Sequence, residues 1–333
     1  MTDRRILPLS EPIYSTYHYQ GISSATHYSN PTVRNWFLNS VMQMYCSRRF
    51  LDGFTTPELT VLDSNFESNR YLNQIIMPFD RIRGRTGEVI RALIDSDTFA
   101  VFRGIDDYYI PGKSWYRERH FYHDGMICGY DMSDRTYYIH AYDSNWQYRV
   151  FKVPQASFHS ARRHSLDKGT NGYLCAVKVK DDTPEFSPYE TVENLKRYMD
   201  SSIEKYPVTD RGNVFGTAAG DYIVMYVRRL EDGSIPYRRT DRRVFRLIWE
   251  HKRVMLERLE KLEEALGVNS DVSYKYREVT DAAREMHMAY AAYCRRQRCE
   301  LLPAIAGKLE HINDTEKRLI DKMIGLSEKE LGL

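Results

Sequence analysis

The sequence of 333 residues is poor in cysteine. Its five cysteines are an odd number and include no CxxC pair, so the pattern excludes a fully paired disulfide framework and a zinc site of the CxxC type. They are Cys46, Cys128, Cys175, Cys294 and Cys299. We therefore expect no metal ion and no bound cofactor.

Charge of one sign and long apolar runs are also lacking. The chain has 48 Lys and Arg residues and 46 Asp and Glu residues, a formal net charge of +2, which argues against bulk attraction to nucleic acid. No apolar run is long enough to cross a membrane, and the first residues, MTDRRILPLSEP, do not form a signal-like core. The sequence thus predicts a cytoplasmic protein whose partners include neither nucleic acid nor a membrane.

The periodicity of apolar residues changes at a polar segment with two prolines, residues 181–188. Before this segment, the pattern predicts strands over 12–20, 98–110, 120–130, 136–143, 147–153 and 172–180, and helices over 31–50 and 85–95. After it, the pattern predicts helices over 189–205, 213–231, 239–267, 271–299 and 302–326. An early helix followed by an antiparallel sheet indicates an α+β domain over 1–183, and an α-helical domain follows over 184–333.

A histidine and an aspartate stand at the two open ends of one predicted hairpin. From His123 the chain passes through small and apolar residues into a turn rich in Gly, Asp and Ser, and it then returns to Asp143. Because such residues lie opposite each other in an antiparallel pair, we expect the two side chains to be neighbours. A carboxylate beside an imidazole prepares it to act as a general base, which is half of a catalytic triad. The alternative is a strand histidine with an ordinary hydrogen bond and an aspartate that opens a loop.

This hairpin resembles the amino-terminal domain of the butirosin-cluster acyltransferase (BtrH-like) family, a papain-fold group related to bacteriocin-processing peptidases. The resemblance rests on the Gly129-Tyr130-Asp131 turn six residues after His123, on Asp143 after the next strand, and on the block 106–111. Residues 191–206, 211–227 and 241–259 are similar to the helical half of family members from nonribosomal-peptide gene clusters.

The resemblance implies a papain-like fold and an enzyme of peptide or antibiotic biosynthesis. Such an enzyme takes an acyl or peptidyl group from the phosphopantetheine thioester of a carrier protein and gives it to an amine acceptor, forming an amide. The same site would be a thioesterase or peptidase if water replaced the amine. The resemblance also leaves a second class of function open, a catalytically inactive scaffold that binds the carrier-bound intermediate.

The family pattern implies a nucleophilic cysteine at the start of the early helix, and this chain departs from it. The helix is expected to begin at Asn30 and Pro31, and its start contains no cysteine. Cys46 lies several turns further on, and we interpret it as a buried, inert thiol. Ser29 is favoured as nucleophile, either naturally or as a replaced cysteine. Two alternatives remain: a lost chemistry with a retained binding cleft, or a register that puts Tyr28, Asn30 or Thr32 at this position.

Other candidate site residues follow from the same comparison. Gln20, upstream of the helix, is the candidate oxyanion stabiliser, with a surface glutamine as the alternative. Asp106 and Tyr108 are expected to flank the substrate cleft. Basic clusters at 81–85, 162–164 and 238–243 indicate solvated faces or, functionally, docking to an acidic carrier protein or its phosphopantetheine phosphate.

Overall fold

The computed structural model describes residues 3–53, 55–202 and 212–333. The chain divides into two units: residues 1–33 with 64–183, and residues 34–63 with 184–333. The last boundary between the units falls between residues 183 and 184, where the sequence pattern changes. The segment 34–63, however, belongs to the second unit and not to the first. The end of the helix predicted over 189–205 lies outside the described residues.

Among the described residues, seven strands form one antiparallel sheet in the first unit, so the α+β class holds. The strands are β1 (Arg4–Ile6), β4 (Leu72–Pro78), β5 (Phe99–Asp106), β6 (Tyr122–Asp131), β7 (Thr136–Tyr142), β8 (Tyr148–Pro154) and β9 (Tyr173–Val179). Their order is β4-β9-β5-β6-β7-β8, and β1 pairs with β6. Strand β1 passes so close to Gly129 of β6 that a Cβ there would lie 2.6 Å from the carbonyl oxygen of Arg5, which explains the glycine at this strand position.

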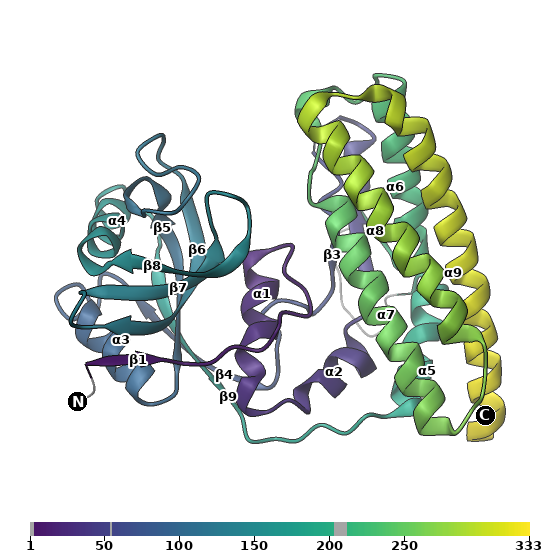
Figure 1. Ribbon diagram of the computed structural model, residues 1–333, viewed down its shortest axis with the longest axis horizontal. Coiled ribbons are helices and arrows are strands. Elements are labelled where there is room, and N and C mark those ends of the chain that lie inside the picture. Colours follow the sequence, from purple (N-terminus) through teal and green to yellow (C-terminus); the bar gives the residue numbers. More distant parts are fainter. Residues whose placement is uncertain (1–2, 54, 203–211) are drawn as a thin grey trace. The chain divides into compact units, whose positions relative to one another are not determined.

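Helices accompany this sheet (Figure 1). The helical segments are α1 (His18–Ala25), η1 (Thr26–Ser29), α3 (Thr86–Asp95), η3 (Asp107–Tyr109) and α4 (Gln155–Asp167). Phe158 of α4 packs edge-on against Phe102 of β5 and Tyr137 of β7, with ring centroids 5.4 and 5.5 Å apart. These contacts belong to one buried core formed by the sheet and its helices.

Two predicted elements near the amino terminus are wrong. The predicted strand over 12–20 does not form: residues 12–17 are irregular, and α1 begins at His18, where the Gln20 side chain accepts a hydrogen bond from the backbone N–H of Tyr17. The predicted helix over 31–50 ends early: α2 covers Val33–Ser40, and the chain then enters β2 (Met44–Ser47). Cys46 lies on β2, where burial raises the pKa of its thiol to about 12.

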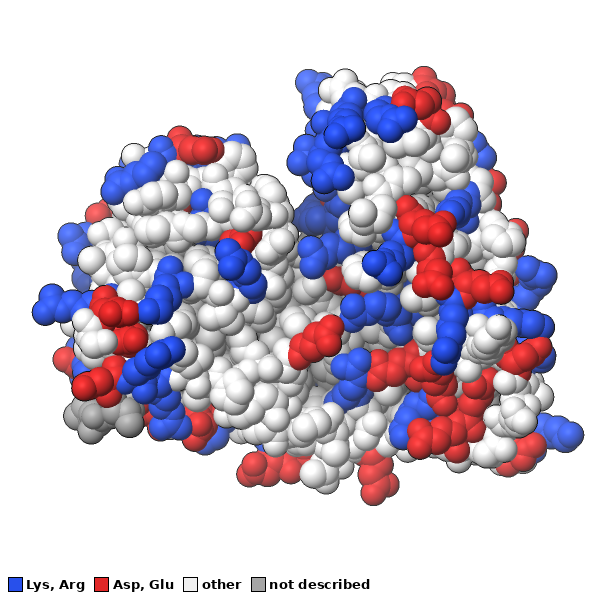
Figure 2. Space-filling view, viewed as in Figure 1, with Lys and Arg blue, Asp and Glu red and all other residues white. Residues whose placement is uncertain are grey.

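The second unit is mainly helical, and Figure 1 shows its long helices side by side. Besides α2, they are α5 (Pro188–Met199), α6 (Gly216–Glu231), α7 (Val244–Leu266), α8 (Val272–Arg296) and α9 (Leu302–Leu331), with short turns η2 (Arg48–Phe50), η4 (Tyr237–Arg239) and η5 (Cys299–Leu301). In a small three-stranded sheet of the described residues, β2 lies between β3 (Thr60–Val61) and β10 (Asn213–Phe215). Acidic and basic side chains are interspersed on the visible face of these helices (Figure 2). No helix of the described residues is long and apolar enough to cross a membrane.

A buried arginine joins α2 to α7 within this unit. The Arg258 side chain is fully buried, and its guanidinium donates to the carbonyl oxygens of Phe37, Leu38 and Val41 at 3.0, 2.5 and 3.1 Å. These carbonyls lie at the carboxyl end of α2, and that of Phe37 also accepts from the backbone N–H of Val41 at 3.2 Å. The arginine thus satisfies a helix end that is buried from water.

We expect Arg258→Met to lower the free energy of unfolding by about 3 kcal/mol, because it removes three hydrogen bonds to carbonyls at the end of α2. Urea denaturation followed by circular dichroism measures the change. Arg277→Met is the matched control, since Arg277 pairs with Glu260 on the surface and its side chain is 61% exposed. A loss no larger than that of the control would contradict the capping role.

Candidate functional site

Two consecutive buried aspartates lie where β5 meets η3: Asp106 ends the strand and Asp107 begins the turn. Asp106 is the N-cap of η3: one carboxylate oxygen, Oδ1, accepts hydrogen bonds from the backbone N–H groups of Tyr108 at 3.1 Å and Phe121 at 3.2 Å. Asp107 begins the turn, and its backbone N–H donates to the carbonyl oxygen of Phe121. The turn therefore fixes both carboxylates through backbone geometry.

Asp107 forms a dyad with His123 of β6. The distance from His123 Nδ1 to Asp107 Oδ2 is 2.9 Å, and a register shift in the β5–β6 ladder places Ile105 opposite His123. With Nδ1 held by the carboxylate, Nε2 remains available as a base, and the His123 side chain is 27% exposed, enough for a substrate to reach it. This is the histidine–carboxylate half of a catalytic site.

A buried lysine completes the surroundings of Asp107. Lys113 Nζ lies 3.7 Å from Asp107 Oδ1, and both side chains are at most 3% exposed. Burial lowers the pKa of Lys113 more than the attraction of Asp107 raises it. The ammonium group offsets the carboxylate charge without occupying the oxygen that holds His123.

The start of α1 lies against His123. His18 is the first residue of α1, and its ring meets the His123 ring edge-on with centroids 4.3 Å apart. The backbone N–H of Tyr142 donates to His18 Nε2 at 3.4 Å. Burial and the charge of Lys113 hold the pKa of His18 well below its usual range, so the ring is neutral at pH 7. The first turn of α1 contains no Ser, Thr or Cys.

The predicted triad is only partly assembled. His123 has a carboxylate partner, but it is Asp107 and not Asp143. The Asp143 carboxylate instead accepts from the backbone N–H groups of Asn145 and Gln147 and pairs with Arg149 at 2.5 Å. These bonds close the β7–β8 turn and leave Asp143 no role at the imidazole.

The predicted nucleophile and oxyanion stabiliser also lie elsewhere than expected. Ser29 is exposed at the end of η1, beyond the carboxyl end of α1, whereas His18 at the other end of α1 contacts His123. Eleven helical residues span about 16 Å, too far for a hydrogen bond to His123. Gln20 is buried in the first turn of α1, and its amide nitrogen donates to Ser64 Oγ at 2.8 Å. It acts as a capping residue in this structure.

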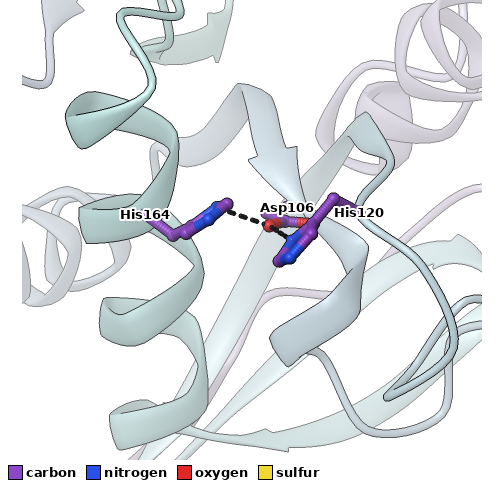
Figure 3. Close-up of side chains that lie close together, drawn as sticks. All are labelled: Asp106, His120 and His164. Carbon is purple, nitrogen blue, oxygen red and sulfur yellow. Dashed lines mark hydrogen bonds and ion pairs between the residues drawn. The ribbon is translucent and has the colours of Figure 1, made fainter.

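Asp106 holds a second group of polar side chains, shown in Figure 3. The Nδ1 atoms of His120 and His164 both lie 2.7 Å from Asp106 Oδ2, and Tyr108 packs on His120 with ring centroids 4.5 Å apart. Asp106 and Tyr108, expected to flank a cleft, thus belong to one cluster of side chains.

The cluster of Asp106, His120 and His164 is the group of described residues whose donor atoms could gather around a metal ion. The two rings, however, stack at 4.3 Å and are within 13° of parallel. Each Nδ1 lone pair lies in the plane of its ring, so two stacked rings do not direct both lone pairs at one ion. As it stands, His120 Nδ1 forms a hydrogen bond with Asp106 Oδ2, whereas His164 Nδ1 lies near that oxygen without hydrogen-bond geometry, and a metal ion would require one ring to turn.

No family model matches this chain, and the comparison with curated proteins gives no match either.

Sequence reasoning missed three members of the site: Asp107, Lys113 and His18. A signal for Asp107 was present, because two adjacent aspartates at the end of an apolar strand put one carboxylate on each face of it. Lys113 and His18 carry no comparable signal, since only the tertiary fold buries them beside Asp107 and His123.

We expect the free energy of unfolding to fall steeply as the pH is lowered from about 6.5 to about 4. Burial lowers the pKa of both His27 and His140 to about 4, so the unfolded chain takes up their protons before the folded one does. Each contributes a loss on the order of 3 kcal/mol by pH 4. Urea titrations at several pH values measure this slope.

The variant His140→Phe should flatten the slope, because phenylalanine takes up no proton. His311→Ala, at an exposed position of α9, should leave it unchanged. An equal slope in the wild type and in His140→Phe would contradict a neutral, buried His140.

Proposed function

We propose that the first unit is a papain-like acyltransferase domain in which His123 is the general base. Its substrate is an acyl or peptidyl thioester on the phosphopantetheine arm of a carrier protein, and its acceptor is an amine. The observation that supports this proposal is the Asp107–His123 pair, whose free Nε2 lies beside the start of α1. A helix start against a strand histidine is the arrangement that the sequence resemblance implies.

The site supports a direct transfer and no covalent acyl-enzyme. The amine nitrogen attacks the thioester carbonyl carbon while His123 Nε2 accepts the proton from the nitrogen. The carbon–sulfur bond then breaks, and the carrier thiolate leaves and receives that proton from His123. Asp107 holds the imidazole in the required tautomer and stabilises its protonated form. Because His18 occupies the helix start, the first turn of α1 offers no serine, threonine or cysteine to form an intermediate.

One observation favours a second candidate, a scaffold that binds the carrier-bound intermediate without reacting with it. The residue at the start of α1 is a neutral, buried histidine, and its Nε2 accepts a hydrogen bond from Tyr142. A histidine so occupied is unsuited to attack a thioester. The two candidates differ in the role of His123, which is needed for direct transfer and is not needed by a scaffold.

The direct transfer predicts that His123→Ala lowers the rate of amide formation by about three orders of magnitude, because the base is removed. Asp107→Asn should lower it by a similar factor, because an amide favours the wrong imidazole tautomer. The measurement is single-turnover release of carrier thiol from an acyl-carrier thioester, with a panel of amines as acceptors.

Ser29→Ala and His311→Ala are the controls, and both should keep the wild-type rate. Equal rates for wild type and His123→Ala, with carrier binding retained, would support the scaffold and refute catalysis.

The papain-like arrangement predicts that His18→Cys creates an activated thiol. A cysteine at position 18 would lie at the amino end of α1 and beside His123, and both features lower a thiol pKa. We expect it to react with iodoacetamide at pH 6 at least about tenfold faster than the same thiol in Ser29→Cys.

Peptide mass spectrometry distinguishes the new thiol from exposed Cys299, and His18→Cys combined with His123→Ala should lose the enhancement. Faster reaction of Ser29→Cys would instead place the nucleophile position at the end of η1 and overturn the assignment to α1.

A further inference from the structure

A cavity of about 430 Å³ lies in the first unit between α3 and α4. Its lining is rich in arginine: Arg83, Arg91, Arg162 and Arg163. Two of the basic clusters in the sequence, residues 81–85 and 162–164, are about 80 residues apart and meet at this cavity. The fold thus brings positive charges together at one place, although the net charge of the whole chain is only +2.

Arg162 is the unusual member of this group. The residue is only 6% exposed, yet its Nε and Nη1 atoms are buried without any hydrogen-bond partner. No ion pair of the described residues includes it. A buried guanidinium without a partner is costly, because the charge has lost its water and gained nothing in return. Such a side chain suits an anionic ligand.

The remaining charges of the lining do not neutralise Arg162. Within the described part of the chain, Arg83, Arg91 and Arg163 form no ion pair either. The one acidic side chain in the lining is Glu88, and its carboxylate pairs with Arg85 at 3.3 Å. The lining therefore carries an excess of positive charge.

The cavity also faces the amino end of α3, a helix of ten residues. Backbone N–H groups in a first helical turn have no partner within the helix and attract anions. Thr86 and Gly87 of this turn line the cavity, and His159 Nε2 and the hydroxyl of Tyr137 lie 3.4 and 3.5 Å from the position of a Cβ at Gly87. Backbone donors and guanidinium groups thus line one cavity.

We infer that this cavity binds a phosphate ester, with Arg162 as the residue that anchors the phosphate group. Arginine presents a planar fork that matches phosphate oxygens in two hydrogen bonds. The cavity is much larger than a phosphate ion, and Tyr130, Met132 and Tyr137 give it apolar lining for an organic group. The inference does not depend on the acyl-transfer proposal, because it uses none of the residues of that site.

The experiment uses the full chain in buffer of low ionic strength without phosphate. Isothermal titration calorimetry measures the dissociation constants of pyrophosphate and of phosphopantetheine, and sodium chloride at equal ionic strength controls for screening. Arg162→Met should weaken binding of both probes at least about tenfold, since it removes charge-assisted hydrogen bonds. It should not lower the thermal stability of the ligand-free protein, because it removes a buried, unpaired charge.

Arg163→Met, at an exposed lining position, is the second test should Arg162→Met fail to fold, and it too should weaken binding. Arg81→Met is the matched control outside the cavity, with a side chain 82% exposed, and should bind as the wild type does. Tighter binding of phosphopantetheine than of pyrophosphate would show that the organic group of a phosphate ester adds to the affinity and would favour the pantetheine arm as the source; equal binding would show that the cavity recognises the phosphate oxygens alone and would favour other phosphate esters. Absence of binding by both probes, or unchanged binding in both lining variants, would overturn the inference.

Discussion

The first unit depends on the burial of two neighbouring negative charges. Asp106 ends β5 and Asp107 begins η3, and their two carboxylates bind different groups. One binds the N–H groups of η3 and the pair His120 and His164, and the other binds His123 and Lys113. Burial of a carboxylate is tolerated only when donors surround it. The fold therefore brings hydrogen-bond donors and cations around the two carboxylates, and these groups form the candidate site.

The sequence predicted the middle of the sheet well, and physical reasons explain where it failed. Strands β5 to β9 alternate apolar and polar residues or read as short apolar runs, which identifies them directly. The segment 12–50 does not, because capping by Gln20 and pairing of β2 with β3 and β10 decide its structure. The pairing of β2 with β10 joins residues about 170 positions apart and leaves no local pattern, whereas the cap is a local signal that the apolar pattern does not contain.

The site shows the same division. His123 was identifiable because it enters a hairpin whose turn is marked by Gly and Asp. Its partner was not, since the hairpin register puts Asp143 opposite it while the turn after β7 takes that carboxylate for its own N–H groups. Local hydrogen bonds compete with long-range ones for the same oxygen atoms, and here the local ones prevail.

The segment 34–63 has a consequence for the order of folding during synthesis. It leaves the ribosome before most of the first unit, but the acceptor of its β-strand pairing, β10, and the arginine that closes α2 lie beyond residue 212. The aromatic and apolar residues of α2 therefore lack these partners until about 200 further residues have been synthesised. The strands of the first unit, which lie before and after this segment in the chain, can form their sheet earlier. A nascent chain of this protein should be a strong client for chaperones that bind exposed apolar segments.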